Sequence, residues 1–143
     1  MRTVSRTDRR RHVYDHGMYA IVDDIQLNRS LAQKWFSKAG ANVVMASTGK
    51  ELVDKVIPTI NEDGSSSFDA ILTDVNMPIM SGDDATRVLR SRGYKGVIIG
   101  LTGSGTDKER KSYMDAGMTT VMVKPFRFDQ LAEIIIEKLE GKE

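Results

Sequence analysis

Four short apolar runs of this chain end on side chains that could do chemistry. These are two adjacent acids, a lone acid, a hydroxyl and an amine: Asp23 and Asp24, Asp74, Thr102 and Lys124. If the runs are parallel strands of one sheet, their carboxyl ends share the edge where open α/β sheets bind ligands. The sequence therefore predicts that these five side chains meet at one site.

A site with three carboxylates needs a cation, because each carboxylate raises the pKa of its neighbours unless a positive charge neutralises them. The chain has no cysteine, and its two histidines, His12 and His16, both lie near the N-terminus. Ligation by oxygen atoms alone is therefore expected. Mg²⁺ suits such ligands, and Mn²⁺ is a second choice.

The predicted chemistry is phosphoryl transfer, because protein-bound Mg²⁺ commonly recruits phosphate oxygens. Lys124 offers an ammonium group to one phosphoryl oxygen, and Thr102 offers a hydroxyl to another. Asp74 lies between the acidic pair and the lysine in the chain, so it is the predicted nucleophile that would form an aspartyl phosphate.

Each of these residues has a simpler structural role when it is taken alone. Asp23 and Asp24 could cap the following helix, because aspartate is a favoured N-cap residue. Asp74 could begin a turn, Thr102 could bond to its own loop, and Lys124 could be a solvated lysine. The predicted site therefore depends on the four strand ends together and in this order.

The apolar runs alternate with segments that have helical periodicity. Continuously apolar runs, typical of strands buried on both faces, lie at 18–23, 42–46, 69–74, 97–101 and 119–123. Helices are predicted at 25–38, 48–60, 81–93, 106–117 and 128–139. Five such units in series predict an α/β fold with a doubly wound parallel sheet and helices on both faces.

Local signals mark two of the helix starts and one loop. Thr48–Glu51 and Thr106–Glu109 have the pattern of a capping box, in which a threonine and a glutamate bond reciprocally to the first turn. The polar stretch Asn61–Ser67 is interpreted as a flexible surface insertion rather than as a site.

The composition is that of one globular domain. A length of 143 residues with 40% hydrophobic residues allows a sizeable core. The lack of cysteine excludes disulfides, thiolate catalysis and cysteine-ligated zinc. The longest apolar runs have about five residues, against the roughly 20 of a membrane helix. We expect a cytoplasmic location and no membrane binding by this domain.

Residues 1–16 are predicted to be a basic tail or linker, and residues 17–141 the folded domain. The net charge is +1, but the first 12 residues contribute +4, so the rest is mildly acidic. A basic arm could contact nucleic acid or a membrane surface. These arginines lack interleaved aromatic residues and an amphipathic period, which favours a linker. No nucleic acid binding is expected of the folded domain.

Together these motifs resemble a response-regulator receiver domain of two-component signalling. The resemblance covers about residues 17–140 and is carried by four segments: Val22–Asp24, Asp74–Gly82, Leu101–Gly103 and Lys124–Phe126. In addition, Asn28 and Arg29 resemble receivers attached to hybrid histidine kinases. The resemblance therefore favours a signalling domain, and favours a fragment of a hybrid histidine kinase as its origin.

The resemblance implies a flavodoxin-like fold, in which five parallel strands have the order 2-1-3-4-5 and are covered by five helices. It also implies a histidine-to-aspartate phosphorelay. Asp74 would accept a phosphoryl group from a phosphohistidine of a histidine kinase or a histidine phosphotransfer protein. The oligomeric state is left open.

The same resemblance implies roles for the site residues. Asp24 and Asp74 would bind Mg²⁺ directly, Asn76 through its backbone carbonyl, and Asp23 through water. Thr102 and Lys124 would bind the phosphoryl oxygens, and the Lys124–Pro125 bond would be cis. Thr102 would turn inward on phosphorylation and reshape the face formed by residues 106–117, 119–123 and 128–139.

One position departs from the pattern of the family. Many receivers have tyrosine or phenylalanine three residues before the lysine, and its rotamer follows the phosphorylation state. Here that residue is Val121. We therefore expect residues 106–128 to move less on phosphorylation than in typical receivers.

Three alternatives belong to other classes. A degenerate receiver would serve only as a protein-binding module, but all five site residues are present. An aspartyl-phosphate phosphatase would need a second acid near the nucleophile, and Asn76 is an amide. A flavodoxin-like electron carrier would bind a phosphate after the first strand, where Asp23 and Asp24 would repel it.

Overall fold

Five short strands form one parallel sheet in the computed structural model, which describes residues 17–141. The strands are β1 (Met18–Val22), β2 (Asn42–Ala46), β3 (Ala70–Asp74), β4 (Val97–Thr102) and β5 (Thr120–Val123). Their order is β2-β1-β3-β4-β5, and each neighbouring pair is parallel. The predicted topology is confirmed. The predicted basic tail, residues 1–16, lies outside the described residues.

Five α-helices connect or follow the strands, as predicted. They are α2 (Gln26–Lys38), α3 (Gly49–Val56), α4 (Gly82–Ser91), α5 (Asp107–Ala116) and α6 (Phe128–Glu140). Helix α3 is shorter than expected and continues as a 3₁₀ turn, η1 (Ile57–Thr59), because Pro58 has no N–H to extend the α-helical ladder. Within residues 17–141, no helix is both long enough and apolar enough to cross a membrane.

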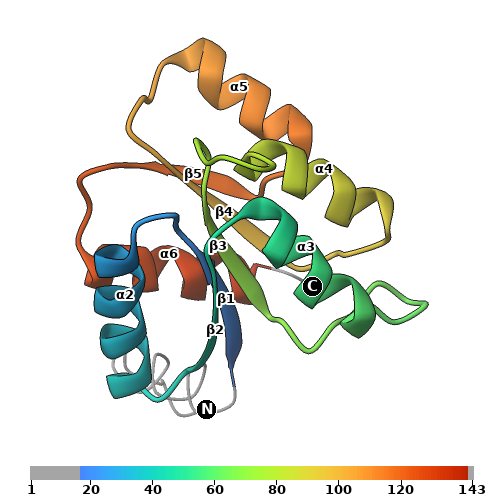
Figure 1. Cartoon of the computed structure of the whole chain (residues 1–143), viewed down its shortest axis with the longest axis horizontal. Helices are drawn as coiled ribbons and strands as arrows, with labels where there is room; N and C mark the ends of the chain where they lie inside the picture. The colour runs from blue at the N-terminus through green and yellow to red at the C-terminus, as the bar shows by residue number, and fades with distance from the viewer. Residues whose placement is uncertain (1–16, 142–143) are drawn as a thin grey trace, which may run out of the picture.

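The helices cover both faces of the sheet (Figure 1). Helices α2 and α6 pack on one face through a core that includes Phe36, Leu131 and Ile135. Helices α3, α4 and α5 pack on the other through residues such as Leu52 and Leu89. The central strands β3 and β4 are buried along their whole length, because both of their faces are covered. This explains why their sequences are apolar without alternation.

The predicted capping boxes are only half formed. The hydroxyls of Thr48 and Thr106 accept the N–H groups of Glu51 and Glu109, which fixes the starts of α3 and α5 as expected. The Glu51 carboxylate does not accept the N–H of Thr48. It accepts the N–H and the hydroxyl of Ser47, at 3.0 and 2.8 Å, and the ammonium of Lys55 at 2.9 Å.

This cluster should give a pH-dependent contribution to stability. The backbone bond from Ser47, followed by the Lys55 ammonium, lowers the pKa of Glu51 from 4.5 to about 2. Because the folded pKa is the lower one, the stabilisation is present above about pH 4.5 and is lost as the pH falls toward 2. Glu51→Gln should lower the free energy of unfolding by about 1 kcal/mol at neutral pH, after allowance for solvent screening.

Chemical denaturation of Glu51→Gln between pH 7 and pH 3 measures this contribution. Asp54→Asn is the matched control on the same helix, because it removes only the exposed Lys50–Asp54 pair and should change stability little. If the loss in free energy of unfolding caused by Glu51→Gln stays constant as the pH falls, the electrostatic explanation is contradicted.

Candidate functional site

The carboxyl ends of four strands converge at one edge of the sheet, as the sequence predicts. In the sheet register Val22 pairs with Thr73, Asp74 with Leu101, and Thr102 with Val123. The chemical side chains therefore follow or end neighbouring strands at one level. Asp23 and Asp24 follow β1, Asp74 ends β3, Thr102 ends β4 and Lys124 follows β5.

The three acids form a cluster with the geometry of a cation site. Asp23, Asp24 and Asp74 each offer a carboxylate oxygen, and these oxygens lie within 4.8 Å of one another. Asp23 and Asp74 are buried and Asp24 is exposed, so the cluster opens to solvent on one side. Asn76 lies two residues beyond Asp74 in the loop after β3, with an exposed side chain. All-oxygen donors with room for water suit Mg²⁺.

Asp74 is the most perturbed acid of the cluster. It is 4% exposed, and one of its oxygens, Oδ1, is 2.5 Å from the Lys124 ammonium nitrogen. Burial raises the pKa of Asp74 to about 6; Lys124 opposes this rise and the negative charge of Asp23 adds to it. At neutral pH the group is therefore ionised, as a nucleophile must be.

The Lys124 ammonium neutralises only part of the charge of this cluster. Its nitrogen lies 2.5 Å from Oδ1 of Asp74 as an ion pair, but three carboxylates share the site. Clustered carboxylates repel one another unless positive charge neutralises them. A divalent cation within the cluster would compensate the remaining negative charge.

Two of the site residues also make the local contacts that a purely structural role predicts. The Asp23 carboxylate accepts the N–H of Ile25 at 2.8 Å, the residue that caps α2. The Thr102 hydroxyl donates to the Ser104 carbonyl and accepts the Ser104 N–H, both at 3.2 Å. These bonds hold the loops after β1 and β4. Of these two residues, only Thr102 would have to break such a bond to contact a ligand, because Ser104 occupies its hydroxyl.

The loop between β3 and α4 is shaped by close backbone contacts. The N–H of Gly82 donates to the Val75 carbonyl at 2.8 Å, which turns the chain from the site into α4. Ile79 and Met80 have positive φ values of 53° and 80°, a conformation that costs about 1–3 kcal/mol per residue. The Lys124–Pro125 bond is cis, as the resemblance implies.

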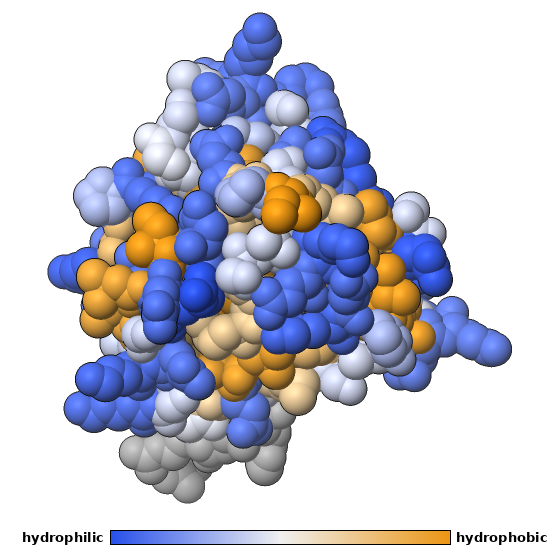
Figure 2. Space-filling view, in the orientation of Figure 1, coloured by the Kyte–Doolittle hydropathy of each residue, from blue (hydrophilic) through white to orange (hydrophobic). Residues whose placement is uncertain are grey.

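Some neighbours of the site were not found from the sequence. The Arg29 guanidinium donates to the Asp23 carbonyl at 2.7 Å. Apolar side chains are also exposed near this edge. Ile25 follows Asp24 in the chain, Leu31 lines a cleft with Asp23 and Lys124, and both are about half exposed. Figure 2 shows hydrophobic surface over α2. In the sequence, the only sign of this surface is that α2 has more apolar residues than its buried face contains.

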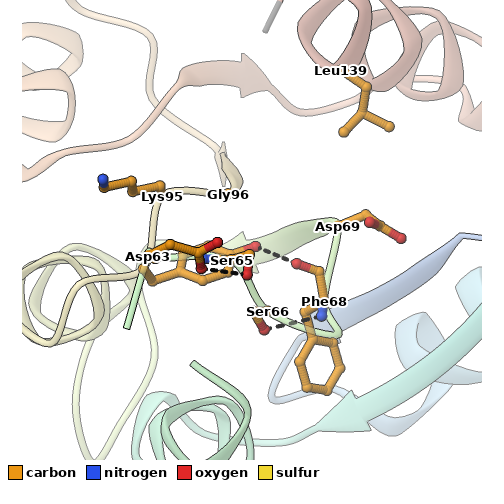
Figure 3. A pocket seen from close by; sticks show the side chains of 10 residues that line it. Asp63, Ser65, Ser66, Phe68, Asp69, Lys95, Gly96 and Leu139 are labelled. Atoms are coloured by element: carbon orange, nitrogen blue, oxygen red, sulfur yellow. Dashed lines mark hydrogen bonds between the residues drawn. The ribbon is translucent and has the colours of Figure 1, made fainter. Parts of the chain in front are cut away.

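A separate hollow of about 500 Å³ lies at the amino ends of β3 and β4, away from these acids. Figure 3 shows its lining, which includes Asp63, Phe68 and Lys95. The predicted surface insertion forms one wall, and the Lys95 N–H donates to the Gly64 carbonyl at 3.1 Å. This hollow is larger than the cleft of about 290 Å³ beside Lys124. It brings together none of the predicted site residues.

The fold and the acidic edge define a doubly wound α/β domain with a candidate cation site, and comparison with known families specifies its class. The family model described as the response regulator receiver domain matches residues 20–136. The chain therefore belongs to this family, whose members are receiver domains of two-component phosphorelay systems.

Relatives include both response regulators and sensor kinases. Two-component response regulator 24 of Arabidopsis thaliana is 33% identical over 80% of this chain and 78% of its own length. The sensor protein EvgS of Escherichia coli strain K12 is 33% identical over 78% of this chain, but that match spans only 9% of EvgS.

A solved structure of a receiver is also similar. The receiver domain of the histidine kinase CKI1 from Arabidopsis thaliana, complexed with Mg²⁺ and BeF₃⁻, has a TM-score of 0.79 and 29% identity. The superposition covers 93% of this chain and 95% of the CKI1 chain. The similarity extends over the whole described domain, so the family assignment applies to the sheet, the helices and the site edge together.

Proposed function

We propose that the chain accepts a phosphoryl group on Asp74 in a histidine-to-aspartate phosphorelay. The observation that carries this proposal is the environment of Asp74: a buried carboxylate that shares an acidic cluster with Asp23 and Asp24 and lies 2.5 Å from the Lys124 ammonium. A phosphoacceptor needs an ionised oxygen, a cation site beside it and a second positive charge for the incoming oxygens.

In the proposed reaction, an Asp74 oxygen forms a bond to the phosphorus of a phosphohistidine. The phosphorus–nitrogen bond breaks, its electron pair returns to the imidazole, and that nitrogen takes up a proton from solvent. Lys124 releases Asp74 and binds a phosphoryl oxygen. Thr102 leaves Ser104 and donates its hydroxyl to another oxygen. These side chains neutralise and position the group, which is most of phosphoryl-transfer catalysis.

Receiver domains of this family bind Mg²⁺ in the active site, and the acids of this chain fit that ion. Asp24, Asp74 and the Asn76 carbonyl would hold it directly, and Asp23 through water; Mn²⁺ would fit the same donors. When bound, the cation supplies charge neutralisation for the carboxylates and the phosphoryl oxygens. The feature of this structure that supports the assignment is the cluster of three carboxylates, whose oxygens lie within 4.8 Å of one another and of which Asp74 is paired with Lys124.

The proposed donor is a histidine kinase or a histidine phosphotransfer protein. Receiver domains interact with proteins of these kinds. The exposed apolar side chains of Ile25, next to Asp24, and of Leu31, in the cleft with Asp23 and Lys124, support docking of a donor there. The similarity to EvgS and CKI1 supports a hybrid histidine kinase as the parent protein, with this domain on its cytoplasmic side.

The test is the intact mass of the chain after incubation with acetyl phosphate. With Mg²⁺ present, we expect a gain of about 80 Da, one phosphoryl group on a carboxylate. With EDTA in place of Mg²⁺, the gain should disappear, because the carboxylates then repel the incoming phosphoryl oxygens. No gain with either acetyl phosphate or a phosphorylated histidine phosphotransfer protein would favour a receiver that serves only as a binding module.

A further inference from the structure

The side chain of Arg29 reaches back from helix α2 to the loop that carries the first two acids of the site. Its guanidinium donates to the Asp23 carbonyl at 2.7 Å. The backbone N–H of Arg29 donates to the Ile25 carbonyl at 3.1 Å, so Arg29 lies one turn into the helix. Helical side chains point toward the N-terminus of their helix, which directs this long side chain at the loop. The proposed phosphoryl transfer uses none of these contacts.

Helix α2 begins without the usual side-chain cap. Its N-cap residue is Ile25, which provides no side-chain hydrogen bond, and its first turn contains no acid. In α3, α4 and α5, by contrast, a serine or threonine hydroxyl accepts an N–H of the first turn. At α2 the side-chain contacts come from the Asp23 carboxylate, which accepts the Ile25 N–H at 2.8 Å, and from Arg29. The loop before α2 therefore depends on these two side chains for its shape.

Asp23 is fixed at three of its polar groups. Its N–H donates to the Ala46 carbonyl of β2 at 3.2 Å, its carboxylate accepts the Ile25 N–H, and its carbonyl accepts the Arg29 guanidinium. The carbonyl of Asp23 and the N–H of Asp24 belong to one planar peptide unit. Because Arg29 fixes the direction of that carbonyl, it orients the backbone that carries the Asp24 side chain.

Asp24 is the acid of the cluster for which such orientation matters most. Asp23 and Asp74 are buried, whereas Asp24 is exposed, so packing does less to hold its side chain. An Asp24 oxygen nevertheless lies within 4.8 Å of oxygens of the other two acids. Groups that hold metal ligands in place typically contribute about 10- to 100-fold to metal affinity. A contact that orients Asp24 should therefore be visible in the affinity for Mg²⁺.

We propose that Arg29 is a positioning residue of the cation site, which holds the peptide unit between Asp23 and Asp24 so that Asp24 can bind Mg²⁺. The inference rests on the proposed function, in which Asp24 binds that ion directly. In this role Arg29 touches neither the ion nor the phosphoryl group. Its charge acts in the opposite direction, because a positive charge near the site repels Mg²⁺. The position and the charge of Arg29 thus have effects of opposite sign, which an experiment can separate.

Titration calorimetry with Mg²⁺ alone tests the proposal. Arg29→Gln removes the charge and also the bond to the loop, because the glutamine side chain is shorter and does not reach across the first turn. We expect the Mg²⁺ affinity to fall about tenfold, whereas loss of the charge alone would raise it. Arg29→Lys keeps the charge and a donor nearly as far from the backbone, so it should restore most of the affinity.

Lys34→Gln is the matched control. Lys34 is an exposed cation on the same helix, and its substitution removes one positive charge without changing the loop. Its Mg²⁺ affinity should stay within about twofold of that of the unsubstituted chain, because salt screens exposed charges. The proposal is wrong if Arg29→Gln binds Mg²⁺ as tightly as the unsubstituted chain or more tightly. It is also wrong if Lys34→Gln loses as much affinity, or if Arg29→Lys binds no better than Arg29→Gln.

The rate of mass gain with acetyl phosphate, measured as a function of Mg²⁺ concentration, is a second readout. In Arg29→Gln the concentration for half of the maximal rate should rise about tenfold, and the maximal rate should change less, because Asp74, Thr102 and Lys124 are untouched. A fall in the maximal rate alone would indicate general damage to the fold and would contradict the positioning role. If the unsubstituted chain neither binds Mg²⁺ nor gains mass, the proposed function itself fails, and the inference with it.

Discussion

Asp74→Asn should not gain mass with acetyl phosphate and Mg²⁺, whereas the unsubstituted chain should gain about 80 Da. Asparagine has nearly the same shape as aspartate, but its amide is not a nucleophile and carries no charge. The variant also loses one of the three carboxylates of the cluster. The expected effect is therefore complete loss of phosphorylation with the fold retained.

Asp69→Asn is a matched control for this experiment. Asp69 immediately precedes β3, at the opposite end of the strand that Asp74 ends, and accepts the N–H of Met18 at 3.0 Å. Its substitution should leave the mass gain intact. If Asp74→Asn still gains a Mg²⁺-dependent phosphoryl group, another residue is the acceptor and the proposed function of Asp74 is wrong.

Asp74→Asn should also make the folded chain more stable at neutral pH when Mg²⁺ is absent. Burial raises the pKa of Asp74 from 3.8 to about 6. Between these values the folded chain holds a proton that the unfolded chain releases, so the contribution of Asp74 to stability falls as the pH rises. A rise of about two pKa units corresponds to about 3 kcal/mol. Asparagine avoids this cost because it carries no charge.

Denaturation in EDTA at pH 7.5 and at pH 4.5 measures this effect. We expect the free energy of unfolding of Asp74→Asn to be higher than that of the unsubstituted chain by about 2–3 kcal/mol at pH 7.5, and by less at pH 4.5. Mg²⁺ should reduce the difference at pH 7.5 by stabilising only the chain with Asp74. Equal stabilities at pH 7.5 would show that Lys124 already compensates the buried charge.

Gly82→Ala is expected to destabilise the fold. A Cβ atom at Gly82 would overlap the backbone carbonyl of Asp74, and backbone atoms cannot move aside as a flexible side chain can. Alanine gains at most about 1 kcal/mol in helix propensity, whereas such overpacking costs about 1–3 kcal/mol or more. The clash should prevail, with a net loss of about 2 kcal/mol and weaker Mg²⁺ binding, because the Asp74 backbone must shift.

Thermal unfolding and Mg²⁺ titration of Gly82→Ala test this expectation. Gly103→Ala is the matched control, because Gly103 is also beside a site residue but a Cβ atom there would meet nothing within 4 Å. The control should keep its stability and its Mg²⁺ affinity. A Gly82→Ala variant as stable as the unsubstituted chain would mean that the β3–α4 loop adapts at little cost.

The architecture could be predicted because its signals are local. Continuous apolar runs marked strands buried on both faces, and helical spacing marked the segments between them. Asp74 ends such a run, so its place at the sheet edge follows from strand direction alone. The early end of α3 was missed, although Pro58 provided a local signal for it.

Contacts between residues distant in the chain required the tertiary structure. The acids and Lys124 could be assigned to one edge from the sequence, but the ion pair of Asp74 with Lys124 and the raised pKa depend on how deeply β3 is buried. The closeness of Gly82 to the Asp74 carbonyl depends on how α4 docks.

The sequence by itself determined the order of the elements and the chemical types that meet at the sheet edge, because periodicity and strand ends are properties of neighbouring residues. The tertiary structure decided which acid pairs with the lysine, how deeply that acid is buried and which glycine cannot be replaced. These features depend on distances of a few ångströms between separate elements, and such distances are set by the packing of the whole core.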